Sequence, residues 1–169
     1  MKPLLFFALL LSCLTVFSQE TETELDRRNG FKDIKLASPI DSVKGAKFKK
    51  DVKENGHPAQ LYTIEDPDYT SIGEVKINSI EARAYKGLIY QIVVLTEKDT
   101  RLMKGMESAL GKPIYNVRDE SYNWVGKKVG LKFSSHSKNQ LELLYTSTTV
   151  LKMMSEDKKQ KVKDIANDF

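Results

Sequence analysis

The chain has 169 residues, with 27 basic and 23 acidic side chains, one cysteine and two histidines. This length suits one domain with an ordinary hydrophobic core. A single cysteine excludes a disulfide framework within the chain. Charges of both signs are well mixed, and aromatic residues do not alternate with the lysines, which argues against nucleic-acid binding.

Residues 1–18 have the features of a secretion signal. Lys2 supplies a positive start, residues 4–16 are almost entirely apolar, and Val16 and Ser18 occupy the −3 and −1 positions of a cleavage site. The apolar run is shorter than the about 20 residues that a membrane span needs. We therefore expect a signal peptide at 1–18 and an exported mature protein, periplasmic or secreted, with no membrane span.

Cys13 offers an alternative, because Leu10-Leu11-Ser12 before it forms a partial lipobox. Lipidation there would anchor the protein to a membrane. The leucine at −2 and the apolar residues 14–17 after the cysteine argue against it. We favour cleavage after Ser18, which removes the only cysteine.

The polar segment 19–30 predicts a disordered lead-in, and a single domain is expected over 31–169. Ser38-Pro39-Ile40-Asp41 has the residues of a capped helix start, with the helix ending near Gly45. Two lysine clusters also stand out. We interpret them as solvated helix faces and loops, and the alternative is contact with anionic envelope surfaces. The clusters comprise Lys44, Lys47, Lys49, Lys50 and Lys53, and Lys158, Lys159, Lys161 and Lys163.

Strand patterns follow. Residues 61–64 predict a strand before the acidic loop 65–69, and apolar residues alternate over 75–84. Lys86-Gly87 predicts a hairpin turn. The apolar run 88–95 predicts a central strand buried on both faces.

A second helix is expected after Thr96, which has capping-box spacing. Its apolar stripe is Leu102, Met106, Ala109 and Leu110, and Gly111 is placed to end it. Strands are then predicted over 122–125, 129–133 and 141–145. A C-terminal helix is predicted over 155–169, capped by Ser155, with one apolar face formed by Val162, Ile165, Ala166 and Phe169.

These elements indicate an α+β fold, an antiparallel sheet of five to eight strands with helices packed on one face. The order of elements is similar in 31–95 and 96–150, which suggests two repeated helix-plus-strands units.

Four segments carry a resemblance to a known group: Phe31-x-x-Ile34-x-Leu36, Ser38-Pro39-Ile40-Asp41, Leu110-Gly111-Lys112-Pro113 and Tyr122-x-Trp124-x-Gly126-x-Lys128-x-x-Leu131. In these segments the chain resembles the small exported α+β proteins of the SmpA/OmlA and β-lactamase-inhibitor-protein-like group. This resemblance implies helices on an antiparallel sheet and a binding or assembly role in the cell envelope.

No pattern in the chain demands a particular chemistry, and we assign no catalytic residue, metal ligand or cofactor. His57 and His136 are expected to be exposed in a loop and at a hairpin tip. Ser134, Ser135 and Ser137 next to His136 do not establish a triad, since triad partners meet in space. The carboxylates Glu65, Asp66 and Asp68, and the pair Asp119-Glu120, lack calcium-loop spacing, so an acidic turn is preferred.

Tyr115, Tyr122 and Trp124 are the candidate binding residues. They could anchor a partner or seal the sheet under a helix, and we favour the core. The sequence predicts a non-catalytic exported module that binds a protein or envelope component. The alternatives are an exported hydrolase using carboxylates or a Ser/His pair, and a lipid-anchored envelope structural protein.

Overall fold

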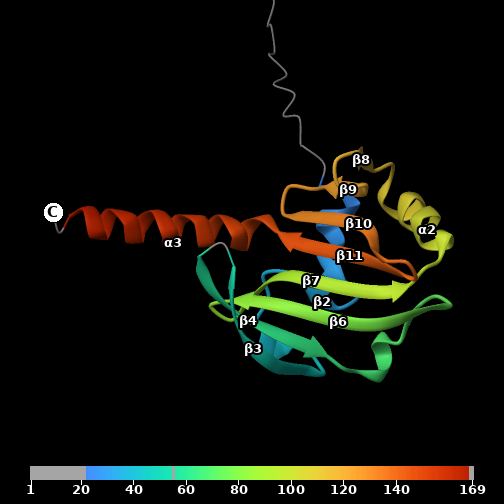
Figure 1. Cartoon of the computed structure of the whole chain (residues 1–169), viewed down its shortest axis with the longest axis horizontal. Coiled ribbons are helices and arrows are strands. Elements are labelled where there is room, and N and C mark those ends of the chain that lie inside the picture. The colour runs from blue at the N-terminus through green and yellow to red at the C-terminus, as the bar shows by residue number, and fades with distance from the viewer. Residues whose placement is uncertain (1–21, 55, 168–169) are drawn as a thin grey trace, which may run out of the picture.

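The computed structural model describes residues 22–54 and 56–167. The predicted signal peptide, Cys13 and Phe169 lie outside these residues. Figure 1 shows a broad antiparallel sheet, with α1 and α2 beside it and α3 projecting from the body. The sheet has nine strands, slightly more than expected, and the α+β prediction is confirmed.

The sheet consists of two antiparallel meanders joined through their last strands. The first contains β3 (Ala46–Glu54), β4 (His57–Ile64), β6 (Val75–Tyr85) and β7 (Leu88–Glu97). The second contains β8 (Ile114–Asn116), β9 (Ser121–Val125), β10 (Val129–Ser137) and β11 (Gln140–Ser147), and β11 pairs with β7. The short strand β5 (Ser71–Ile72) pairs with β6, and β1 (Gly30–Phe31) pairs with β2 (Ile34–Lys35) in a separate hairpin.

The β6–β7 hairpin confirms the predicted turn. Lys86 and Gly87 both have positive φ angles, 50° and 78°, as a two-residue hairpin turn of type I′ requires. The strand that follows is central, but it is not buried on both faces. Ile92 and Val94 are fully buried, whereas Val93 and Leu95 on the opposite face are half-buried.

The predicted lead-in is not disordered from residue 22 onward. Helix α1 (Glu24–Arg28) begins at Thr23, whose side chain accepts a hydrogen bond from the Asp26 amide. Leu25 and Asp26 are buried, so α1 is part of the packed domain. Too few apolar residues occur in 19–30 for the sequence pattern to indicate this.

Three predicted helix starts need correction. The first helix is a single 3-10 turn, η1 (Ile40–Ser42), and the Ser38 hydroxyl donates to the Lys35 carbonyl instead of capping it. Helix α2 (Thr100–Leu110) is capped by Asp99, because Thr96 belongs to β7. Helix α3 (Thr148–Ala166) begins one residue after Ser147, so Ser155 lies inside it.

The lysines of residues 44–53 lie on and beside an edge strand, where helix faces and loops were predicted. Among the described strands, β3 pairs only with β4. Charged side chains on an edge strand discourage pairing with another chain. This arrangement explains the lysine density without a ligand.

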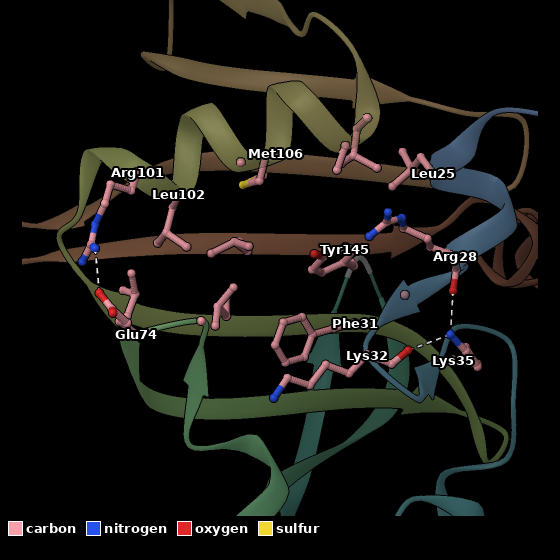
Figure 2. Close-up of a pocket in the computed structure, with 18 residues that line it drawn as sticks. Leu25, Arg28, Phe31, Lys32, Lys35, Glu74, Arg101, Leu102, Met106 and Tyr145 are labelled. Atoms are coloured by element: carbon pink, nitrogen blue, oxygen red, sulfur yellow. Dashed lines mark hydrogen bonds and ion pairs between the residues drawn. The ribbon is translucent and has the colours of Figure 1, made fainter.

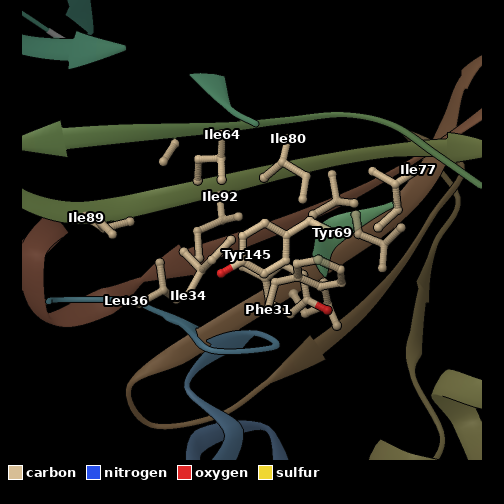
Figure 3. Packing of buried hydrophobic residues seen from close by; sticks show 14 of the residues in the cluster. Phe31, Ile34, Leu36, Ile64, Tyr69, Ile77, Ile80, Ile89, Ile92 and Tyr145 are labelled. Atoms are coloured by element: carbon tan, nitrogen blue, oxygen red, sulfur yellow. The ribbon is translucent and has the colours of Figure 1, made fainter. Parts of the chain in front are cut away.

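The main core lies between the sheet and a cover formed by α1, the β1–β2 hairpin and α2. Phe31 from the hairpin packs against Tyr145 of β11, with ring centroids 6.1 Å apart, and aliphatic side chains surround them (Figure 3). Because side chains alternate along β6, Tyr85 faces away from this core. Tyr85 joins a smaller cluster with Val150 and Met154 of α3. The prediction of helices on one face therefore holds for α1 and α2 only.

Each half of the chain supplies one four-stranded meander, but the helical parts differ. Eleven residues form α2 before the second meander, whereas three form η1 before the first. The proposed repeat of whole units is not confirmed. Within the described residues, no helix has the length and apolar character needed to cross a membrane.

Candidate functional site

The principal concavity is an apolar cleft with a volume of about 750 Å³. Helix α2 forms one wall, α1 and the β1–β2 hairpin form the other, and β11 lies at the floor (Figure 2). The turn between β5 and β6 closes one end. The apolar lining includes Leu25, Phe31, Leu102, Met106, Leu110 and Leu143. This volume is in the range of small-molecule sites, roughly 300–1,000 Å³.

Helix α2 presents its apolar stripe to this cleft. Leu102, Met106 and Leu110 recur every four residues and therefore lie on one side of the helix. Gly105 lies among them, and an added Cβ there would meet no atom within 4 Å. The stripe was predicted, but it covers the sheet only in part and leaves the cleft between α2 and the hairpin.

The opposite wall is fixed by Asp26. Its carboxylate accepts hydrogen bonds from the backbone amides of Lys127, Lys128 and Val129 at 2.8, 2.7 and 3.0 Å. The Thr23 hydroxyl donates to it at 2.9 Å. Burial by itself would raise the pKa of Asp26, but these donors hold the pKa below its ordinary value. A charged Asp26 thus fastens α1 to the start of β10.

Two salt bridges lie at the end of the cleft near the β5–β6 turn. The Arg101 guanidinium contacts the carboxylates of Glu74 and Asp99, both at 2.8 Å. Hydrogen bonds to these two carboxylates raise the pKa of Arg101. Glu74 is the only carboxylate in the lining, and its charge is paired here.

The other end of the cleft is basic. Lys35 donates to the carbonyls of Arg28 and Lys32 at 2.8 and 2.7 Å, and Lys32 donates to the carbonyl of Asp68. No carboxylate of the described residues contacts either ammonium group. The charges of Lys32 and Lys35 are thus held in place by neutral partners.

Tyr145 lies at the floor beside Arg28 (Figure 2). It is 8% exposed, and burial raises the pKa of its hydroxyl to about 12. The hydroxyl is therefore neutral and able to donate at physiological pH. It forms no hydrogen bond with any described residue.

The three aromatic residues singled out in the sequence have different surroundings and lie outside this cleft. Trp124 is buried, and its indole N–H donates to the Gly111 carbonyl at 2.7 Å. Tyr115 and Tyr122 form an exposed cross-strand pair, with ring centroids 4.9 Å apart. The core placement is right for Trp124 and wrong for the two tyrosines. Their part in binding stays a prediction.

Both histidines were expected to be exposed, and only His136 is. His57 is the first residue of β4 and is 7% exposed, with its ring edge-on to Tyr85. His136 lies within β10 and is exposed, with its Nδ1 3.3 Å from a Glu142 carboxylate oxygen. The Ser135 and Ser137 hydroxyls contact the Ser137 carbonyl and the Gln140 side chain, and neither contacts His136.

The acidic loop is a structural turn, as preferred from the sequence. Asp66 caps the 3-10 turn η2 (Pro67–Tyr69) by accepting from the Asp68 amide. Lys44 contacts both of these carboxylates at 3.2 Å. Asp119 accepts from Ser121 and contacts Lys132. Over residues 22–54 and 56–167, no three His, Cys, Asp or Glu side chains are grouped to hold a metal ion.

Sequence reasoning missed the cleft because its basic end comes from residues 28–35, which form no sequence motif. One signal was available, since Phe31, Ile34 and Leu36 are apolar while the basic residues Lys32 and Lys35 lie between them. That alternation predicts one buried side and one basic side for the hairpin. It does not say that the basic side borders a cleft.

Comparison of the sequence with protein-family models and curated proteins, and of the fold with solved structures, finds no match. The resemblance to the SmpA/OmlA and β-lactamase-inhibitor-protein-like group therefore stays a prediction.

Proposed function

We propose that the protein is a non-catalytic binding module, exported as its first 18 residues predict, that takes an apolar envelope component into the cleft between α1 and α2. The observation that carries the proposal is the cleft itself, about 750 Å³ in volume and lined mainly by aliphatic and aromatic side chains. Water leaves such a surface readily, and each Å² of apolar area removed from water contributes about 25 cal/mol.

The lining supports binding better than hydrolysis. It contains no histidine, cysteine or serine, and its one carboxylate is paired with Arg101. A glycosidase-type mechanism needs two carboxyl groups across the substrate, which this cleft does not supply. The alternative of a Ser/His pair is not supported either, because the hydroxyls of Ser135 and Ser137 contact groups other than His136.

Titration with the neutral fluorophore N-phenylnaphthylamine tests the proposal. We expect saturable binding with a blue-shifted emission. Gly105→Phe places a ring in the space beside α2, so it should weaken binding at least about tenfold. Ser108→Phe is the matched control, since Ser108 is exposed on the same helix and outside the lining. Equal binding by both variants, or none by the unaltered protein, would contradict the proposal.

A further inference from the structure

We infer that the ligand of this cleft is a single-chain amphiphile with an anionic head, whose alkyl chain lies along α2 and whose head faces Arg28, Lys35 and the Tyr145 hydroxyl. This inference rests on the proposed function, because it names the ligand class of the same cleft. Carboxylate and phosphate heads share the chemistry that these three groups recognise.

The two ends of the cleft differ in charge. Near the β5–β6 turn, Arg101 is matched by Glu74 and Asp99. On the hairpin, Lys35 donates only to backbone carbonyls, and the Lys32 ammonium donates to the Asp68 carbonyl and lies over two aromatic rings, so neither is matched by a carboxylate of the described residues. The attraction for an anion is therefore concentrated at the hairpin end.

Arg28 is also placed to bind an anion at this end of the cleft. Its Nε donates to the Glu24 carboxylate at 2.7 Å, which fixes the direction of the side chain. Its two terminal nitrogens have no partner among the described residues. They project over the floor of the cleft beside Tyr145 (Figure 2). A guanidinium with free terminal N–H groups binds carboxylate or phosphate oxygens well.

Tyr145 gives independent support. The residue is 8% exposed and borders the cleft, and its hydroxyl forms no hydrogen bond with any described residue. The hydroxyl oxygen keeps some exposed surface, so it is open to the cleft and free to donate to a bound group. A neutral donor next to a guanidinium provides two different hydrogen bonds to one anionic head, and an alkyl chain alone satisfies neither.

The chain direction follows from the lining. From the floor at Tyr145, apolar side chains continue along α2 through Met106 to Leu102. A head held at Arg28 therefore lies at the end opposite the Arg101–Glu74 salt bridge, with its chain on the apolar stripe. The reverse orientation would place the anion beside Glu74 and leave Arg28 without a partner.

Calorimetric titration of the full mature chain tests this with four dodecyl ligands, each below its micelle concentration: dodecanoate, dodecyl phosphate, dodecanol and dodecyltrimethylammonium. We expect both anions to bind at least about tenfold more tightly than dodecanol, and the cation most weakly. The tighter of the two anions identifies the head group. If dodecanol equals the anions, or the cation binds best, the inference is wrong while the proposed function stands. If no dodecyl ligand binds, both are wrong.

Variants locate the head. Arg28→Gln should remove most of the advantage of dodecanoate over dodecanol, leaving about threefold or less. Arg27→Gln is the matched control, because Arg27 contacts the same Glu24 at 2.7 Å but lies outside the lining. Tyr145→Phe removes no hydrogen bond within the protein, so it should fold normally and bind dodecanoate about fivefold more weakly. Undiminished dodecanoate binding by Arg28→Gln would overturn the placement of the head.

Discussion

Two helices are attached to the sheet by an aspartate, and the two attachments differ in burial. Asp26 of α1 is 3% exposed and accepts from three backbone amides and the Thr23 hydroxyl. The Asp157 side chain of α3 is 29% exposed and contacts the Tyr85 hydroxyl at 2.8 Å and the Lys86 ammonium at 2.7 Å. Helix α1 is packed into the core, while α3 projects from the body (Figure 1).

From this difference in burial we expect the two charged contacts to contribute unequally to stability. Around Asp26 the amides have few alternative partners, so removing the carboxylate leaves buried donors unpaired. Around Asp157 water can replace the carboxylate. The side chains of Val162 and Ile165, from the predicted apolar face of this helix, are each 61% exposed. Helix α3 therefore adds little to the core after its second turn.

The largest effect is expected for Asp26→Asn. The amide group cannot accept from all four donors, so we expect the free energy of unfolding to fall by about 3–5 kcal/mol. Denaturant unfolding followed by the fluorescence of Trp124, the only tryptophan, measures this directly. Because α1 forms one wall of the cleft, dodecanoate binding should fall as well. A loss below about 1 kcal/mol would contradict the assigned role.

Gly126→Ala should disturb the same attachment between α1 and the start of β10, through a residue that faces Asp26. A Cβ at Gly126 would lie 2.4 Å from a carboxylate oxygen of Asp26. The carboxylate must shift away from its amide donors, and we expect a loss of about 2 kcal/mol. Gly130→Ala is the matched control, since a Cβ there meets nothing within 4 Å. Equal unfolding midpoints for the two variants would show that the Asp26 carboxylate can move away from the added methyl group at little cost.

The contrast also explains how far the sequence could predict this protein. The strands β6, β7, β10 and β11, the Lys86-Gly87 turn and the α2 stripe all follow from local sequence patterns and were predicted, although burial of β7 on both faces was wrong. Helix α1 was not, because its stability comes from amides about 100 positions away in the chain. Nothing in the local pattern distinguishes Asp26 from the other polar residues of 19–30. The cleft was missed for the same reason, since α1 and the hairpin form its wall.

Acid should weaken the Asp26 attachment. The pKa of Asp26 is lowered in the folded state, so the charged form stabilises the fold above the unfolded pKa of about 3.9. This contribution is lost as the pH falls from about 5 through the folded pKa. We expect the free energy of unfolding of the unaltered protein to fall over this pH range. Its slope against pH should be steeper than that of Asp26→Asn, by the equivalent of at most about one bound proton. Parallel slopes in urea titrations at several pH values would contradict this.

The smallest effect is expected for Asp157→Asn. Hydrogen bonds from Lys86 and Tyr85 lower the pKa of Asp157 too, but its surroundings are solvated. We expect the melting temperature to change by no more than about 2 °C, because exposed ion pairs contribute little. Amide exchange should respond more than the melting temperature, with faster exchange over residues 155–166, since Asp157 ties this part of α3 to the β6–β7 hairpin. A melting temperature as low as that of Asp26→Asn would show that α3 belongs to the cooperative core, and that burial does not separate the two attachments.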